Sequence, residues 1–208
     1  MKQTGLMFKA PLVRAILSGQ KTQTRRAFSG HMVKQMRAAA AIGEVSHFLD
    51  GGILRPNDLA YVQQFSPVGE PGDRIYVRET FGYGGDAYTP DLYFRASQSD
   101  APIQGCWHPA IHMRKADARI WLEVAGVRME RLQSITEQDA IAEGIERTAD
   151  FFNCPCWRDY SEPEGPDAAV CPDDPIDSFR TLWESTGGDW EANPWVWVID
   201  FKRIEKPR

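Results

Sequence analysis

The sequence predicts an α+β fold in which a small β-barrel carries short flanking helices and two insertions. The chain of 208 residues contains many short strand-like segments and few short helical ones. These segments do not follow the strand–helix–strand rhythm that builds parallel sheets, which favours a barrel of short strands. Two stretches without a clear period, at about 27–70 and 148–174, are predicted as insertions. We therefore expect one domain that spans residues 1–208.

The N-terminal part is predicted to supply two strands and two helices. Residues 5–9 form a short apolar segment typical of a strand. Pro11 suits the first turn of a helix, and Gly19 ends that helix where a left-handed residue is usually needed. Residues 22–26 alternate in a pattern compatible with a strand. Inside the first insertion, the Ala-rich segment 32–42 is predicted as a helix.

Four further strands are predicted from local signals in the sequence. Residues 74–79 and 92–95 are predicted as strands, and residues 119–129 as one long, bent strand with a candidate bulge at Gly126. The segment 195–201 is a clear final strand.

Two helices are predicted from their capping residues. Thr136 and Asp139 form a capping box, with Asp in place of the usual Glu, and Gly144 closes the short helix that follows. Pro175 begins a later helix that has its apolar residues on one side.

Charge is distributed unevenly along the chain. The 24 Lys and Arg against 29 Asp and Glu give a net charge of −5, which excludes a uniformly basic protein that coats a polyanion. Residues 1–37 nevertheless contain eight basic residues and no acidic one, whereas residues 148–177 contain eight acidic residues and one basic residue. The first segment either gathers phosphate or is solvated surface charge, and the pattern leaves both interpretations open.

The apolar runs of the chain are far too short to span a bilayer, and Lys9 and Arg14 interrupt the apolar segment nearest the N-terminus. We therefore expect a cytoplasmic protein without a membrane partner. In that compartment we expect the cysteines to be thiols or metal ligands rather than a disulfide framework. A zinc site that includes His108 stays open, because the cysteine spacing departs from the usual zinc knuckle. The chain has four cysteines: Cys106, Cys154, Cys156 and Cys171.

Five segments carry a resemblance to a known family. Residues 15–25 read AILSGQKTQTR, residues 72–79 read GDRIYVRE, and residues 135–145 read ITEQDAIAEGI. The ending NPWVWVIDF at 193–201 and the IHM at 111–113 complete the set. In their order and spacing they resemble the ASCH domain family of the PUA-like superfamily, in particular its longer phage and prophage members. The resemblance implies a PUA-like β-barrel and requires no metal or other cofactor.

The chain is similar to the small bacterial N4-acetylcytidine amidohydrolases of this family, which implies three catalytic residues: Lys21, Thr24 and Glu143. A threonine hydroxyl attacks an amide carbonyl only after a base removes its proton. A lysine can act as that base when burial or neighbouring cations lower its pKa below the usual value of about 10.4. A glutamic acid can then protonate the departing amine.

Each of these side chains also has a purely structural interpretation. Lys21 can cover a helix end, Thr24 can be an ordinary strand residue, and Glu143 can be exposed in the last helical turn. Nearby guanidinium groups suit a phosphate or a base carbonyl, or else form surface salt bridges. A carboxylate at the end of an apolar strand face points into a pocket or lies at the barrel rim. The candidate substrate-binding residues on these grounds are Arg25, Arg26, Arg78 and Glu79.

The sequence therefore leaves two functions open. The first is an amidohydrolase that converts N4-acetylcytidine to cytidine. The second is a non-catalytic PUA-like module that binds RNA or a nucleotide, supported by the acid-free N-terminal segment. The expected partner is a nucleoside or nucleotide ligand or, for the second function, RNA, and the oligomeric state is not indicated. Both insertions follow motif-bearing segments and can narrow or cover the pocket.

Overall fold

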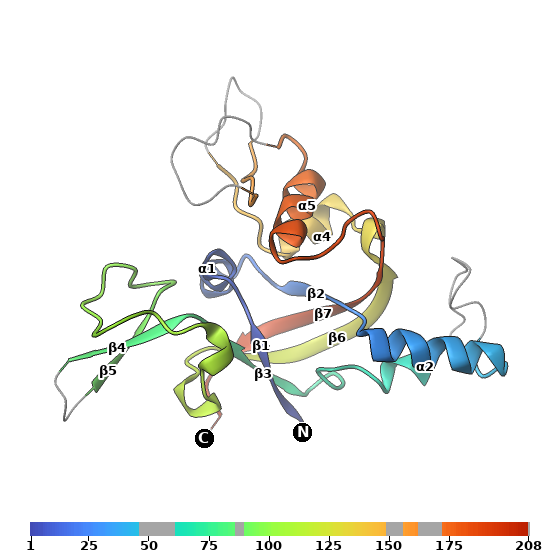
Figure 1. Ribbon diagram of the computed structural model, residues 1–208, viewed down its shortest axis with the longest axis horizontal. Coiled ribbons are helices and arrows are strands. Elements are labelled where there is room, and N and C mark those ends of the chain that lie inside the picture. The colour runs from blue at the N-terminus through green and yellow to red at the C-terminus, as the bar shows by residue number, and fades with distance from the viewer. Residues whose placement is uncertain (46–60, 86–89, 149–155, 162–171, 208) are drawn as a thin grey trace.

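The computed structural model describes residues 1–45, 61–85, 90–148, 156–161 and 172–207 (Figure 1). The α+β class is confirmed. Five strands form one mixed sheet in the order β1-β3-β6-β7-β2, in which β1 and β3 are parallel and the other neighbours antiparallel. The strands of this sheet are β1 (Gln3–Met7), β2 (Gln23–Ala27), β3 (Arg74–Arg78), β6 (Trp121–Arg131) and β7 (Trp195–Ile204).

A second, two-stranded sheet extends from the side of the molecule (Figure 1). It consists of β4 (Phe81–Gly85) and β5 (Pro90–Phe94), which pair in antiparallel fashion. The sequence did not predict β4, because three of its five residues are glycines, which are depleted in strands. The predicted strand 92–95 corresponds to β5 and begins two residues earlier than expected.

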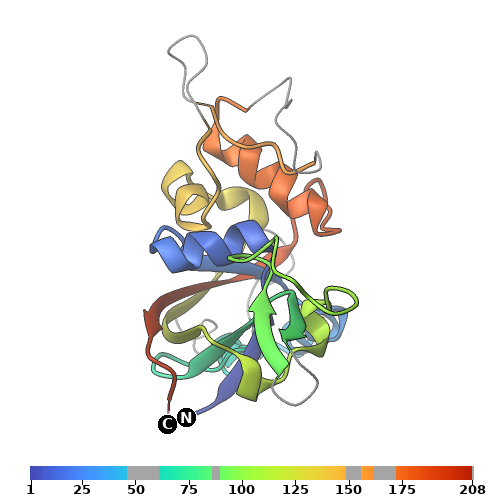
Figure 2. The same ribbon diagram turned by 90° about the vertical axis from the view of Figure 1, so that its left-hand side faces the viewer.

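The α-helices are α1 (Ala10–Ser18), α2 (Gly30–Ala41), α4 (Glu137–Ala142) and α5 (Pro175–Ser185). Figure 2 shows α1, α4 and α5 lying one above another at one end of the molecule, with both termini at the opposite end. Three short 3-10 helices lie at Ala110–His112, Lys115–Asp117 and Leu132–Ser134. Within the described ranges, every helix is too short or too polar to cross a membrane.

The local signals in the sequence identify several element ends correctly. Pro11 lies in the first turn of α1, and Gly19 closes that helix with a φ of 82°. Thr136 and Asp139 form both hydrogen bonds of the capping box at the start of α4. The pairing of β6 with β7 shifts register next to Gly126, as the predicted bulge requires.

Other predicted bounds are displaced by a few residues. The strand expected at 5–9 ends at Met7, because Lys9 is already the N-cap residue of α1. Helix α2 begins earlier than expected, because the Ser29 side chain caps it by accepting from the Met32 N–H. Most of the second predicted insertion, and residues 46–60 of the first, lie outside the described residues.

Two hydrophobic clusters lie on opposite sides of β7, which explains why its sequence WVWVI is apolar throughout. Trp197 and Ile199 belong to the cluster that also contains residues of α1, α2 and β3. Val196 and Val198 belong to the second cluster, beneath α4 and α5. A strand with both faces covered must be apolar at odd and even positions alike. The α4–α5 layer is therefore fixed directly onto the sheet.

Gly144, directly after α4, is expected to be intolerant of a side chain. It has a φ of 83°, and an added Cβ would lie 2.7 Å from the Lys21 Cβ and 2.8 Å from the Ala15 Cβ. Gly19 is the matched control, because its φ of 82° is the same but nothing lies within 4 Å of its added Cβ. We expect Gly19→Ala to lower the free energy of unfolding by about 1–2 kcal/mol through backbone strain alone.

In Gly144→Ala the steric overlap adds a further loss of about 1–3 kcal/mol. Denaturant titration of the two variants measures the difference. Equal losses would show that the contact between Gly144 and Lys21 is not tight.

Candidate functional site

The segment that follows α1 is fixed to the end of α4 by backbone hydrogen bonds. The Thr22 N–H donates to the Ala142 carbonyl at 2.9 Å, and the Gln20 side-chain amide donates to the Ile145 carbonyl at 2.6 Å. These contacts join residues more than one hundred positions apart in the chain. They place Lys21, which lies between Gln20 and Thr22, directly beside the C-terminus of α4.

Lys21 and Glu143 form a buried ion pair at this junction. The Lys21 Nζ lies 2.8 Å from the Glu143 Oε2, and the side chains are 0% and 4% exposed. The same ammonium donates to the Glu143 backbone carbonyl at 2.6 Å and to the Gln23 carbonyl at 2.7 Å, so all three of its hydrogens are used. Glu143 is therefore not exposed in a last helical turn. Lys21 does bind a carbonyl at the end of α4, so the helix-covering interpretation is also met.

Burial lowers the pKa of Lys21, because the charged ammonium has lost its water. The negative charge of Glu143 and its hydrogen bond oppose this effect, and the positive charges of Arg26 and Arg25 add to it. The net direction is downward, which is the direction that a lysine base requires.

Arg25 lies behind the ion pair in a cluster of acidic residues. Its Nη1 is 3.2 Å from the Glu143 Oε1, and its Nη2 is 3.2 Å from the Glu130 Oε2 and 3.3 Å from the Asp139 Oδ2. Arg128 of β6 contacts Glu130 and Asp139 from the more exposed side. The Arg25 guanidinium, a candidate substrate-binding group in the sequence, is thus engaged by three carboxylates of the protein itself.

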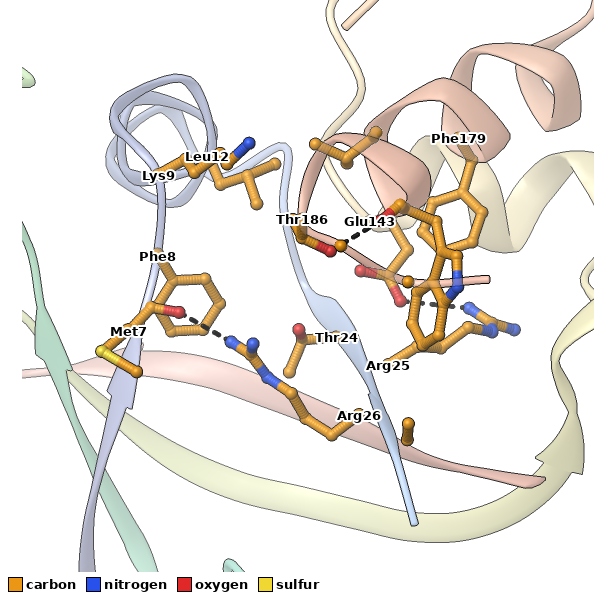
Figure 3. A pocket seen from close by; sticks show the side chains of 15 residues that line it. Met7, Phe8, Lys9, Leu12, Thr24, Arg25, Arg26, Glu143, Phe179 and Thr186 are labelled. Carbon is orange, nitrogen blue, oxygen red and sulfur yellow. Dashed lines mark hydrogen bonds and ion pairs between the residues drawn. The ribbon is translucent and has the colours of Figure 1, made fainter. Parts of the chain in front are cut away.

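A cavity of about 300 Å³ opens beside β2, between the start of α1 and helix α5. Figure 3 shows Thr24, Arg26 and Glu143 facing this space from different directions. The Arg26 guanidinium lies 5.1 Å from the Phe8 ring centroid and donates to the Met7 carbonyl at 2.8 Å. The lining residues are Met7, Phe8, Lys9, Leu12, Thr24, Arg25, Arg26, Ala27, Glu143, Phe179, Leu182, Trp183, Thr186, Gly187 and Gly188.

Arg78 and Glu79 do not line this cavity. Arg78 donates to the Ile111 carbonyl. Glu79 is buried and accepts two hydrogen bonds from Arg119, at 2.8 and 2.9 Å, and the Arg119 guanidinium stacks on the Phe94 ring at 4.1 Å. These residues form a separate ion pair next to the β4–β5 ribbon. Of the sequence-predicted set, the fold brings together Lys21, Thr24, Arg25, Arg26 and Glu143.

The acid-free N-terminal segment does not form one basic surface. Lys21 and Arg25 are buried and paired with carboxylates from later elements. Arg14 lies 3.5 Å from Glu146. Two of the eight basic side chains of the segment thus lie in the interior, and the argument from its composition for RNA binding loses weight.

The cysteines depart from expectation at one position. Cys156 is disulfide-bonded, so it is neither the thiol nor the metal ligand that the sequence predicted. Cys106 is a free, exposed thiol. Cys154 and Cys171 lie outside the described residues, and within the described part no three His, Cys, Asp or Glu side chains are arranged to hold a metal ion.

Sequence reasoning missed the aromatic wall of the cavity. Phe8 precedes α1, and Phe179 and Trp183 come from α5. The signal was present in part, because Phe179 and Trp183 belong to the apolar stripe of that helix. A stripe of this kind usually faces the core, so the pattern did not distinguish a cavity wall from core packing.

Comparisons of the chain with family models, with curated proteins and with solved structures found no match.

Asp139 is expected to stabilise the fold in a pH-dependent manner. Partial burial opposes its ionisation, but hydrogen bonds from Thr136 and the charge of Arg25 outweigh this and lower the pKa of Asp139. Because the folded-state pKa lies below the unfolded value of about 3.9, the carboxylate stabilises the fold above that value and loses its effect as the pH falls through the folded-state pKa. Asp139→Asn should therefore lower the free energy of unfolding by about 1–3 kcal/mol at pH 7.

Near pH 3 the difference between Asp139→Asn and the wild type should shrink, as denaturant titration at both pH values will measure. Asp177→Asn is the control, because Asp177 is also in the first turn of a helix but is exposed. A loss for Asp139→Asn that does not depend on pH would contradict the assignment of its effect to the charge.

Proposed function

We propose that the cavity beside Thr24 hydrolyses the N-acyl bond of an acylated nucleoside, with N4-acetylcytidine as the substrate. One observation carries this proposal. The Thr24 hydroxyl faces a cavity that Glu143 and Arg26 also line, and Glu143 forms a buried ion pair with Lys21. A nucleophile, a base and an acid are thereby present within one small volume, as acyl transfer requires.

In the proposed reaction, the Lys21–Glu143 pair first becomes neutral. A proton moves from the ammonium to the carboxylate along the 2.8 Å contact, and the lowered pKa of Lys21 favours this form. The resulting amine accepts the Thr24 hydroxyl proton while the Thr24 oxygen attacks the acetyl carbon. The C–N bond then breaks, and the N4 nitrogen takes a proton from the Glu143 carboxyl group.

A water molecule completes the cycle. It attacks the acetyl ester on Thr24 and gives a proton to the Glu143 carboxylate, while the Lys21 ammonium returns a proton to the Thr24 oxygen. The products are cytidine and acetic acid, and the neutral pair is restored. The Arg26 side chain, which lies on the same face of β2 as Thr24, is proposed to stabilise the negative charge on the acyl oxygen.

The proposal includes the fold. We assign the five-stranded sheet to a PUA-like β-barrel of the ASCH type, in which β1 and β2 are the neighbours that complete the ring. The Arg26 side chain of β2 donates to the Met7 carbonyl of β1 at 2.8 Å, which supports this closure. The cavity lies at this junction, since Met7 and Arg26 both line it.

A second candidate function is the binding of a nucleotide or an RNA without catalysis. It is favoured by the three oxygen atoms around the Lys21 Nζ, because they stabilise the ammonium form, and an ammonium cannot act as a base. This candidate predicts nucleoside or nucleotide binding without turnover. RNA binding would in addition weaken steeply with salt, because phosphate contacts release counterions.

Replacement of the proposed nucleophile tests the enzymatic function. We expect wild-type protein to release cytidine from N4-acetylcytidine, as chromatography of the products will measure. Thr24→Val keeps the β-branched shape but lacks the hydroxyl, and it should lower kcat by at least about a thousandfold. Thr22→Val is the matched control, because Thr22 is exposed and does not line the cavity.

Two outcomes would contradict the enzymatic function: no cytidine release by folded wild-type protein, or full turnover by Thr24→Val. Binding of N4-acetylcytidine without release would select the second candidate function.

A further inference from the structure

The strand β2 has one free edge. It is the last strand in the order β1-β3-β6-β7-β2, and among the described residues it pairs only with β7. The Phe201 N–H donates to the Thr22 carbonyl, and the Phe28 N–H donates to the Trp195 carbonyl. These bonds define the even-numbered residues as the hydrogen-bonded positions of the antiparallel pair. The backbone groups of the odd-numbered residues, Gln23, Arg25 and Ala27, therefore point away from β7.

The cavity lies along this edge of β2. The exposed fractions of Arg25 show which atoms of that residue face the cavity. The Arg25 side chain is 0% exposed, whereas the whole residue is 4% exposed and lines the cavity. The exposed atoms of Arg25 thus belong to its backbone. At the preceding odd position, the Gln23 carbonyl is already occupied by the Lys21 Nζ at 2.7 Å. For the Arg25 N–H and C=O, the described part of the chain supplies no hydrogen-bond partner.

A backbone N–H and C=O from the same residue form a donor–acceptor pair that normally binds one residue of a neighbouring strand. The cavity beside this edge is also lined by Leu12 of α1 and by Leu182 and Trp183 of α5, and its volume of about 300 Å³ suits a small ligand. A ligand that matches both the donor and the acceptor gains specificity, because a ligand that lacks one of them leaves the other polar group without a partner in the complex.

We infer that the Arg25 backbone forms hydrogen bonds with the edge of the substrate's base. This inference rests on the proposed function. The Arg25 N–H donates to a ring nitrogen, and the Arg25 carbonyl accepts from the adjacent exocyclic N–H. In N4-acetylcytidine these two atoms are N3 and N4. The ligand class is therefore a planar heterocycle with a ring-nitrogen acceptor beside an acylated amine, and Phe8 and Trp183 supply aromatic surface for its plane.

Binding measurements with substrate analogues test this assignment. The protein used is Thr24→Val, in which the Lys21–Glu143 pair and the Arg25 backbone are intact but the nucleophile is absent. We expect N4-acetyl-3-deazacytidine, which lacks the ring acceptor, to bind at least about tenfold more weakly than N4-acetylcytidine in calorimetric titration. N4-acetyl-N4-methylcytidine, which lacks the donor, should be affected similarly. The 2′-deoxy analogue controls for the loss of a polar atom away from the edge.

Nuclear magnetic resonance supplies a second measurement, the signal of the Arg25 amide proton. This signal would not change on ligand binding if the Arg25 backbone had only a structural role. The Arg25 amide proton should shift downfield and exchange more slowly with solvent when N4-acetylcytidine binds, and less so with the 3-deaza analogue. Equal affinity for both compounds, an unchanged Arg25 amide in the complex, or no binding of any of these nucleosides overturns the inference. If wild-type protein binds with this signature but releases no cytidine, the hydrolase proposal fails while the reading of the base edge stands.

Discussion

A fully buried ammonium group imposes a condition on the residues around it. Removing the charge of Lys21 from water costs several kcal/mol unless acceptors replace the lost hydration. Three oxygen atoms do so here, two from Glu143 and one from Gln23. They reach the ammonium only because the end of α1, the start of β2 and the end of α4 meet at one point. The absence of a Cβ at Gly144 lets the chain leave α4 without colliding with the Lys21 side chain. The positions of these three elements are thus tied to a single charge.

The strand β2 separates three kinds of contact by direction. Thr24 and Arg26 present side chains to the cavity, whereas the side chains of Gln23 and Arg25 enter the acidic cluster on the other face. The backbone edge is the third direction. Unpaired strand edges commonly recruit other strands and lead to aggregation, and natural proteins cover them. Here side chains of α1 and α5 line the cavity beside the edge, which leaves a space of about 300 Å³ that suits a small molecule.

Local rules account for much of what the sequence predicted. The cap at Thr136, the stop at Gly19 and the bulge near Gly126 depend on a few neighbouring residues, and such signals survive in any fold. The direction of the Arg25 side chain could not be predicted in this way. Its partners Glu130 and Asp139 lie more than one hundred residues along the chain, and only the assembled sheet brings them near.

In the candidate site too, local patterns predicted some features, whereas contacts between distant residues could not be predicted. No pattern in residue types or spacing would have indicated the contact of Lys21 with Glu143. Alternation placed Glu79 on a buried face, yet it gave no sign of Arg119, the residue that neutralises it.

The central position of β7, between β6 and β2, also has a consequence for synthesis of the protein. Until residues 195–204 leave the ribosome, β2 has no strand to pair with and β6 lacks its longest partner. Truncated chains that end before this segment leave β2 without a partner strand and β6 paired with β3 alone, and they will aggregate rather than accumulate as folded fragments.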